Sequence, residues 1–260
     1  MDPGLVDEAV TLARMAGELT LRWFRSDDLG VHLKDDGTPV TAADRAAERL
    51  VRDELAQRHP DDGVLGEEEA ELVGTSGRRW ILDPIDGTKA FTCGVPLYTN
   101  LLAVEDEHGP AVGVINVPAL GETVWAGRGL GCFCNGRPAS VSDRAQLDGA
   151  YLSTSSFAPW SDGALASVRG TALNLRTWGD GYGYVLVATG RVEAMVDPVA
   201  AYYDLAPMPV ILAEAGGRFT DLDGGEGPGN GSGVATNGHV HDELLELLGG
   251  AGARVDTVLG

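Results

Sequence analysis

An apolar run that ends in two closely spaced carboxylates constrains this chain more than any other feature. The segment is Arg78-Arg79-Trp80-Ile81-Leu82-Asp83-Pro84-Ile85-Asp86-Gly87-Thr88. Its first five residues are typical of a short buried strand, which we expect Pro84 to stop. We expect Asp86 to cap a helix that begins at Gly87. The segment therefore predicts a strand, a turn and a helix, with both carboxylates at the turn.

The two carboxylates of this segment predict a metal site beside a phosphate site. Asp83 directly follows the apolar strand, where a buried carboxylate without a partner is costly. Hard oxygen ligands suit Mg²⁺, and the N-terminus of a helix suits a phosphate group. A purely structural explanation is therefore weakest for Asp83.

Further polar residues beside predicted turns have both a structural and a functional interpretation. Glu67 lies in an acidic run and could be simply solvated, while Asp86 and Asp204 could be helix N-caps. Asp44 could be the acidic member of a capping box, and Thr88 a first-turn helix residue. Taken singly, each is more often structural, so only their occurrence together favours a site.

Composition excludes several classes of function. The chain has 260 residues, 43% of them hydrophobic, which is enough for a sizeable core. Its 19 basic and 39 acidic residues give a net charge of −20, which argues against nucleic acid as a partner. Such a surface also simply keeps a protein soluble.

The cysteines and the lengths of the apolar runs indicate the cellular location that we expect for the protein. Cys93, Cys132 and Cys134 form neither a zinc pattern nor a disulfide framework. No apolar run approaches the roughly 18 residues that a membrane span requires. We therefore expect no membrane association and a reducing, cytoplasmic location.

The order of predicted elements indicates an α/β protein with two layered halves and a cleft between them. Apolar side chains recur at helical spacing over residues 3–25, and Thr41-Ala42-Ala43-Asp44 has the form of a capping box before a second helix over 42–58. Short apolar runs then predict an antiparallel meander in this α+β half. They cover residues 100–104, 111–117, 123–126 and 131–134. We place the first half at residues 1–144.

From residue 145 to 260 strands and helices alternate, which predicts an α/β second half. The expected strands cover residues 151–154, 172–176, 192–196 and 233–236. The expected helices cover residues 158–168, 182–188, 205–215 and 240–248. Pro207 and Pro209 predict irregular first turns in the third of these helices.

Four motifs in this order resemble those of inositol-monophosphatase-like phosphatases, and the match spans nearly the whole chain. They are Lys34 with Thr38-Pro39-Val40-Thr41-Ala42-Ala43-Asp44, Gly66-Glu67-Glu68, Asp83-Pro84-Ile85-Asp86-Gly87-Thr88 and Tyr203-Asp204-Leu205-Ala206. The resemblance implies a layered αβαβα sandwich, a homodimer, two or three Mg²⁺ ions and sensitivity to lithium.

The resemblance also assigns roles by position. It implies metal ligation by Glu67, Asp83, Asp86, Asp204 and the backbone carbonyl of Ile85. It places Asp44 and Thr88, with Glu67, in the catalytic set, where Asp44 and Thr88 orient and deprotonate the attacking water. The backbone N–H groups of Gly87 and Thr88 then contribute donors to the phosphate.

Residues of the second half bear on the substrate. The segment Trp178-Gly179-Asp180-Gly181-Tyr182-Gly183-Tyr184 resembles the histidinol-phosphate phosphatase branch, and Lys89 is consistent with that branch. By position Asp180 and Asp197 face the alcohol part of the substrate, where two carboxylates suit an ammonium or imidazolium group. The structural alternative is that Asp180 only caps a helix starting at Gly181. The leading hypothesis is hydrolysis of L-histidinol phosphate to L-histidinol and phosphate.

Three departures from the family pattern leave other substrates open. Ala90, Cys93 and Tyr203 stand where relatives usually carry other residues. An inositol or aminocyclitol phosphate is therefore the alternative substrate. A non-catalytic sugar-phosphate binding protein and a purely structural acidic surface are the alternatives from other classes.

Overall fold

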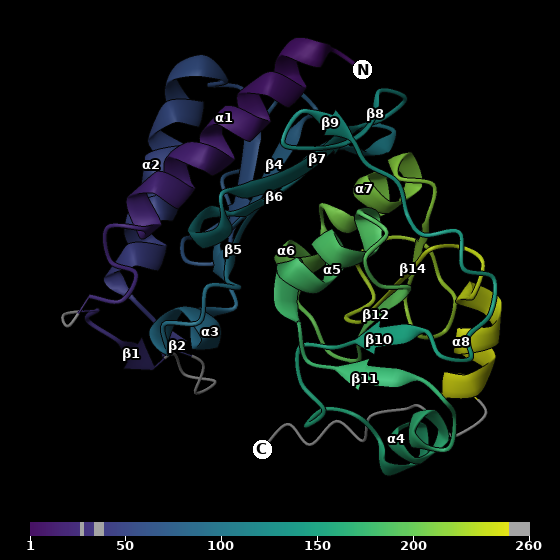
Figure 1. Cartoon of the computed structure of the whole chain (residues 1–260). Coiled ribbons are helices and arrows are strands. Elements are labelled where there is room, and N and C mark those ends of the chain that lie inside the picture. The colour runs from purple at the N-terminus through teal and green to yellow at the C-terminus, as the bar shows by residue number, and fades with distance from the viewer. Residues whose placement is uncertain (27–28, 34–38, 250–260) are drawn as a thin grey trace.

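The computed structural model describes residues 1–26, 29–33 and 39–249 (Figure 1). Lys34 and Thr38, which belong to the first family motif, lie outside the described residues. Two helices and a short antiparallel strand pair open the chain: α1 (Pro3–Thr20), β1 (His32–Leu33), β2 (Pro39–Val40) and α2 (Ala42–Arg58). No helix within the described residues combines the length and the apolar character needed to cross a membrane.

Helix α1 is shorter than the range 3–25 predicted from its periodicity. The Asp2 side chain caps its start by accepting from the Gly4 N–H at 2.9 Å. Beyond Thr20 the chain turns, and Trp23 packs with the buried rings of Phe91 and Tyr98 instead of extending the apolar stripe. Tertiary packing of the aromatic side chains therefore ends the helix one turn early.

Helix α2 spans the residues that the capping box predicts. Thr41 is the N-cap, its hydroxyl accepts from the Ala43 N–H at 3.2 Å, and Asp44 accepts from the Thr41 N–H at 2.8 Å. This local hydrogen-bond pattern explains why the sequence alone located the helix.

The first sheet has seven strands in the order β3-β4-β5-β6-β7-β8-β9. The strands are β3 (Gly63–Gly66), β4 (Arg79–Asp86), β5 (Thr99–Asp106), β6 (Gly109–Val117), β7 (Glu122–Gly127), β8 (Gly131–Cys134) and β9 (Arg137–Pro138). From β4 onward all pairings are antiparallel, which confirms the predicted meander. Strand β3 pairs parallel to β4 and was not predicted, since it has only four residues and a glycine at each end.

The turn predicted around Pro84 is a distorted strand end. Strand β4 continues through Pro84 to Asp86 with a register shift after Asp83, so Pro84 does not stop it. The helix that follows, α3 (Thr88–Thr92), is capped by Gly87 at φ +79°, a left-handed conformation that suits glycine. The prediction that Asp86 caps a helix beginning at Gly87 was therefore wrong.

The second half contains a five-stranded mixed sheet in the order β11-β10-β12-β14-β13. Its strands are β10 (Tyr151–Ser153), β11 (Asn174–Arg176), β12 (Ala194–Asp197), β13 (Arg218–Thr220) and β14 (Gly233–Thr236). Its helices are α4 (Asp162–Arg169), α5 (Asp180–Ala188), α6 (Tyr202–Leu205), α7 (Met208–Glu214) and α8 (His241–Gly249). The helix expected over 205–215 is divided into α6 and α7 at Pro207, in line with the irregularity that Pro207 and Pro209 predict. The 3₁₀ turn η1 (Pro118–Leu120) lies in the first half.

The elements stack in five layers, which confirms the predicted αβαβα sandwich (Figure 1). Helices α1 and α2 cover one face of the first sheet, and α5 and α7 pack between the two sheets. Helices α4 and α8 cover the outer face of the second sheet. The site described next lies where β4 of the first half meets α5 and α6 of the second. The division of the chain at residue 144 stays a prediction.

Candidate active site

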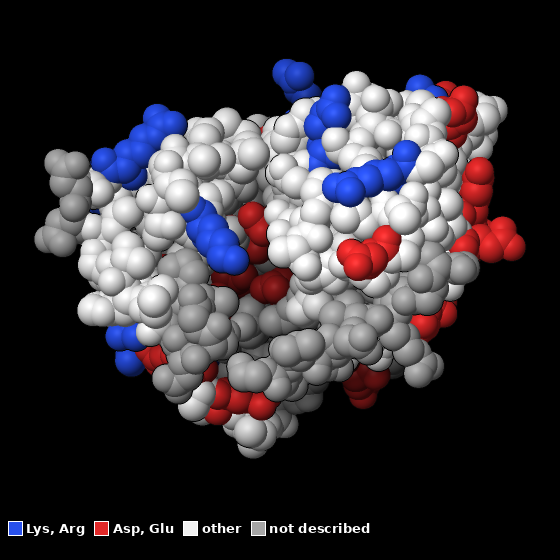
Figure 2. Space-filling model, turned by 90° about the horizontal axis from the view of Figure 1, so that it is seen from below, with Lys and Arg blue, Asp and Glu red and all other residues white. Residues whose placement is uncertain are grey.

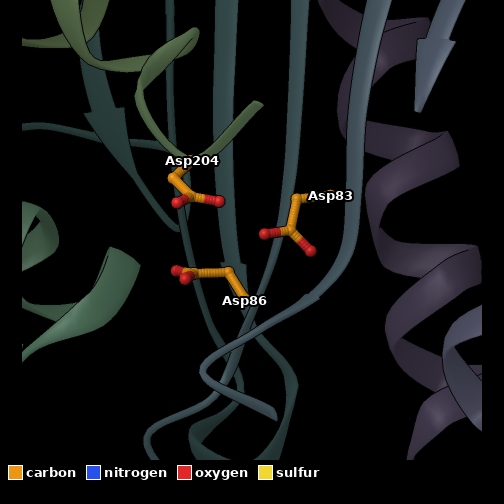
Figure 3. Close-up of side chains that lie close together, drawn as sticks. All are labelled: Asp83, Asp86 and Asp204. Atoms are coloured by element: carbon orange, nitrogen blue, oxygen red, sulfur yellow. The ribbon is translucent and has the colours of Figure 1, made fainter. Parts of the chain in front are cut away.

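A hollow between the two halves has acidic side chains at its floor (Figure 2). Asp83 and Asp86 come from β4, and Asp204 comes from α6. One carboxylate oxygen from each lies within 4.8 Å of the others, and the three groups point toward a common space (Figure 3). Residues far apart in sequence thus form one acidic cluster.

Asp83 is the buried centre of this arrangement. Its side chain is 2% exposed, and its Oδ1 accepts a hydrogen bond from the Ile85 N–H at 3.1 Å. Burial raises the pKa of Asp83 well above its usual value, and the neighbouring Glu67, Asp86 and Asp204 add to the effect. A cation bound nearby would favour the ionised form of this carboxylate.

Asp86 receives hydrogen bonds from both halves of the molecule. Its Oδ2 accepts from the Thr99 hydroxyl at 2.8 Å and from the N–H of Gly181 at the start of α5. A side chain at residue 181 would put its Cβ 2.3 Å from Thr99 Oγ1 and 2.7 Å from Asp86 Oδ2, so this approach requires glycine. Burial, followed by Asp180 and Asp204, raises the pKa of Asp86.

Asp204 and Glu67 complete the acidic wall. Asp204 is not the N-cap that its structural interpretation expected: the N-cap of α6 is Ala201, and Asp204 Oδ2, at the third helical position, accepts from the Ala201 N–H at 2.8 Å. Burial raises the pKa of Asp204 to about 6. Glu67 follows β3 and is not one of the three clustered carboxylates, but its charge raises the pKa of both Asp83 and Asp204.

Asp44 has a buried carboxylate oxygen without a protein partner. Its Oδ2 accepts from Thr41 N at 2.8 Å and Thr41 Oγ1 at 2.5 Å, whereas its Oδ1 is buried and makes no hydrogen bond with the described residues. Burial raises the pKa of Asp44 to about 6, and the charges of Glu68 and Glu67 add to the shift. The capping role and a functional role therefore use different oxygens of one side chain.

The segment after Asp86 orients Thr88 and the Ile85 carbonyl toward each other. The Thr88 hydroxyl donates to the Ile85 carbonyl at 3.0 Å, while the Ile85 side chain is anchored in an apolar cluster with Ala43, Phe91 and Tyr98. A carbonyl oxygen has a second lone pair, so Ile85 retains one acceptor position. Lys89 is exposed on α3.

Asp180 and Asp197 line a cavity of about 100 Å³ that also touches Asp86 and Asp204. Asp197 is 6% exposed, and it accepts from the Ser155 N–H and from the Tyr184 hydroxyl, each at 3.0 Å. Burial raises the pKa of Asp180 to about 6, and repulsion from Asp197 contributes.

The structural alternative for Asp180 is wrong. Helix α5 begins at Asp180 itself, and Gly179 is its N-cap. Asp180 has φ +53°, an uncommon backbone conformation for a residue with a side chain, and its N–H donates to Ser155 Oγ at 2.8 Å. The side chain is therefore available to the cavity and does not cap the helix.

Sequence reasoning missed the polar residues that support this site. Asn100 donates to the Pro84 carbonyl at 2.6 Å, and Thr99, Ser155 and Tyr184 hold the carboxylates described above. The one sequence signal for Asn100 was that a polar residue begins the otherwise apolar run 100–104. Thr99 and Ser155 lie in segments with no pattern pointing to a site, whereas Tyr184 ends the segment 178–184 that already indicated a substrate site.

Comparison with known proteins identifies the family. A model of the inositol monophosphatase family matches residues 4–251. The chain belongs to the inositol monophosphatase family. The family resemblance drawn from the four motifs is thereby confirmed, and the protein is a phosphoric monoester hydrolase acting on a small phosphorylated molecule.

Relatives of this chain include three histidinol-phosphatases. The one from Mycobacterium tuberculosis is 45% identical over 249 residues, covering 92% of this chain and 96% of the relative. The one from Streptomyces coelicolor is 40% identical over 254 residues, covering 92% and 95%. Among solved structures, the extragenic suppressor protein suhB from Bartonella henselae has a TM-score of 0.87 at 29% identity, covering 94% of this chain and 98% of its own. Thermotoga maritima IMPase has a TM-score of 0.86 at 30% identity, covering 95% and 98%.

Members of this family depend on metal ions, and the residues found here fit a hard divalent cation. All the candidate donors are oxygen atoms, which Mg²⁺ prefers. The clustered carboxylates repel one another, and the buried Asp44 Oδ1 has no hydrogen-bond partner among the residues that the structure describes. Both features would be relieved by bound cations and the water molecules that accompany them.

Proposed function

We propose that this protein hydrolyses L-histidinol phosphate to L-histidinol and phosphate with Mg²⁺ as its cofactor. The observation that carries the substrate is the carboxylate pair of Asp180 and Asp197 in the cavity beside the acidic cluster. Relatives named histidinol-phosphatase at 40% to 45% identity support the same choice.

The proposed metal ligands are the carboxylates of Glu67, Asp83, Asp86 and Asp204 and the carbonyl of Ile85, which together would hold two or three Mg²⁺ ions. Bound there, the ions would neutralise phosphoryl and leaving-group oxygens and lower the pKa of a water molecule. The cluster geometry of Asp83, Asp86 and Asp204 supports this assignment.

Asp44 and Thr88 are the proposed residues that orient and deprotonate the attacking water, together with Glu67. The Thr88 hydroxyl proton is directed at the Ile85 carbonyl, which leaves the hydroxyl oxygen to accept a hydrogen bond from water. Asp44 Oδ1 has an unused acceptor position for a proton. The backbone N–H groups of Gly87 and Thr88, with the Lys89 ammonium group, would bind the phosphate.

Asp180 and Asp197 are the proposed contacts to the alcohol part of the substrate. Hydrogen bonds from Ser155 and Tyr184 fix the Asp197 carboxylate, so it is preorganised. An ammonium or imidazolium group placed between two carboxylates makes charge-assisted hydrogen bonds and offsets their repulsion. The hydroxyl groups of a neutral polyol can donate to these carboxylates but carry no positive charge to offset their repulsion.

An inositol or aminocyclitol phosphate is the alternative substrate. The inositol-1-monophosphatase of Rhizobium meliloti is 36% identical over 248 residues, which favours testing the inositol ester. The non-catalytic alternative is disfavoured by membership of a phosphatase family. A purely structural acidic surface is disfavoured because Asp83, Asp86 and Asp197 are buried.

The substrate proposal is tested by comparing kcat/KM for histidinol phosphate, myo-inositol 1-phosphate and an aminocyclitol phosphate at saturating Mg²⁺. We expect histidinol phosphate to be preferred, and Asp180→Asn to reduce its kcat/KM far more than that of the inositol ester. Asp148→Asn, at an exposed turn of the same half, is the control and should change neither. An equal loss on all three esters, or a wild-type preference for inositol phosphate, would contradict the proposal.

We also propose the homodimer and the cytoplasmic location expected from the sequence. The family resemblance supports the dimer, and the three unpaired cysteines are consistent with a reducing compartment. Sedimentation equilibrium tests the dimer, and cell fractionation tests the location.

A further inference from the structure

Glu48 lies one turn after Asp44 on α2 and has no role in the site as described so far. Its side chain is 1% exposed, although it carries a carboxylate. Glu48 Oε2 accepts from the Glu68 N–H at 2.8 Å, and Oε1 accepts from the Glu69 N–H at 3.0 Å. Its hydrogen bonds are therefore directed at the segment that carries Glu67.

Arg52 completes the contact. Its Nε donates to Glu48 Oε1 at 2.8 Å, and its NH2 donates to the Glu69 carbonyl at 3.1 Å. The buried charge of Glu48 is thus balanced by one guanidinium group and two backbone donors, the condition under which a buried carboxylate is tolerated. The same guanidinium group also holds the segment through its backbone.

The position of Glu48 coincides with the end of regular strand pairing. Strand β3 pairs in parallel with β4 up to Gly66, which lies opposite Leu82. Glu67 follows Gly66 as Asp83 follows Leu82, so the two residues are neighbours at the end of this pairing, and the charge of Glu67 raises the pKa of Asp83. Beyond Gly66 the pairing with β4 stops, and Glu48 accepts from the N–H groups of Glu68 and Glu69.

Gly66 is the residue that permits this approach. A Cβ at position 66 would lie 2.2 Å from Glu48 Oε1 and 2.7 Å from Oε2, which is far inside van der Waals contact. The glycine of the Gly66-Glu67-Glu68 motif therefore makes room for a side chain from α2.

We propose that Glu48 is a positioning residue, which holds segment 66–69 so that the Glu67 carboxylate faces Asp83. The inference rests on the proposed function in one respect, since Glu67 matters to catalysis only as a metal ligand. Helix α2 thereby carries two buried carboxylates one turn apart: Asp44, which is proposed to act on the attacking water, and Glu48, which holds the neighbouring segment.

The effect of Glu48 on the order of segment 66–69 is measured in the metal-free protein. Glu48→Gln replaces an acceptor with an amide group that faces the same N–H donors and Arg52. Hydrogen exchange of the metal-free protein, read at the amides of Glu68 and Glu69, should be at least about tenfold faster in the variant. The matched control is Glu54→Gln, which breaks an exposed pair with Arg58 at the same spacing on the same helix and should leave these amides unchanged.

The effect on the ligand is measured as Mg²⁺ affinity by titration calorimetry. Mutation of a residue that orients a ligand typically costs 10- to 100-fold in metal affinity, so Glu48→Gln should weaken binding by at least about tenfold. Glu54→Gln should bind as the wild type does. A positioning role further requires that kcat at saturating Mg²⁺ fall less than the Mg²⁺ affinity does.

The two outcomes separate the inference from the proposed function. Wild-type Mg²⁺ binding with unchanged affinity in Glu48→Gln overturns the positioning role. A wild-type protein that binds no Mg²⁺ overturns the proposed function, and the positioning role with it. If Glu48→Gln does not fold, Arg52→Gln is used in its place, because it removes the guanidinium group that balances Glu48. Arg52→Gln must then show the same faster hydrogen exchange at the amides of Glu68 and Glu69 and the same loss of Mg²⁺ affinity.

Discussion

The side-chain amide of Asn100 on β5 donates to the backbone carbonyl of Pro84 on β4 at 2.6 Å. Strand β4 shifts register after Asp83, so this carbonyl loses its partner in the strand ladder, and Asn100 replaces it. The cross-strand neighbour Asn116 in turn donates to Asn100 at 3.0 Å, and Thr123 donates to Asn116 at 2.9 Å. A buried polar ladder thus supports the distortion that brings Asp83 and Asp86 into one site.

Asn100→Leu should destabilise the metal-free protein by about 2 kcal/mol, because it leaves the buried Pro84 carbonyl without its side-chain donor and removes the acceptor that Asn100 offers to Asn116. It should also weaken Mg²⁺ binding, since the distorted segment between the two aspartates loses its support. Urea denaturation and titration calorimetry measure the two effects. Asn174→Leu removes a comparable bond to the Gly149 carbonyl in the other half and should leave Mg²⁺ affinity intact. Normal Mg²⁺ affinity in Asn100→Leu would contradict this view of the ladder.

Asp44→Asn should lower kcat by roughly 10²- to 10⁴-fold at saturating Mg²⁺, as expected for loss of a group that accepts a proton. It should not lower stability, because burial raises the pKa of Asp44 to about 6 and an amide avoids a buried charge at higher pH. Steady-state kinetics and urea denaturation at pH 8 test both statements. A kcat within about threefold of wild type would exclude Asp44 from the catalytic set.

Mg²⁺ should stabilise the protein more strongly as the pH rises from 5 to 8. In the metal-free fold the pKa of Asp204 is raised to about 6, and those of Asp83 and Asp86 are raised too. A raised folded-state pKa gives stability that is complete at low pH and is lost as the pH rises through the folded value. Bound Mg²⁺ removes that loss, and a concentration of about 100 Kd contributes about 2.7 kcal/mol.

Scanning calorimetry with and without Mg²⁺ measures this difference across the pH range. Titratable groups remote from the cluster change Tm equally with and without Mg²⁺, so their contribution cancels in the difference. A Mg²⁺-induced shift in Tm that is the same at pH 5 and pH 8 would contradict the assignment of the metal to these carboxylates.

His241 should make the fold sensitive to mild acid. Its ring is fully buried between the hydroxyls of Thr220 and Thr236, at 3.0 Å and 2.9 Å. Burial lowers the pKa of His241 from its usual value of 6.5 to about 4, and the charge of Arg218 contributes. The stability it provides is therefore complete above about pH 6.5 and is lost as the pH falls toward 4. The stability difference between wild type and His241→Gln should shrink over that interval, and a constant difference would show that His241 does not titrate there.

Sequence signals predicted the helices and strands whose hydrogen bonds join residues close together in the sequence. The capping box of Thr41 and Asp44 located α2, and alternating short apolar runs located the meander. The end of α1 was misplaced because Trp23 packs against Phe91 and Tyr98, which no local pattern reveals. Strand β3 was missed because its pairing to β4 is a contact between distant segments.

The sequence by itself determined which chemical groups the site has available: the carboxylates of Glu67, Asp83, Asp86 and Asp204, in an order that indicates a phosphatase of one family. Only the tertiary structure decided how they meet. The approach of Asp204 to Asp83, the support from Asn100 and the hold of Glu48 on its segment all join residues distant in sequence. Such contacts depend on how sheets and helices pack in three dimensions, and residue type and spacing along the chain do not encode them locally.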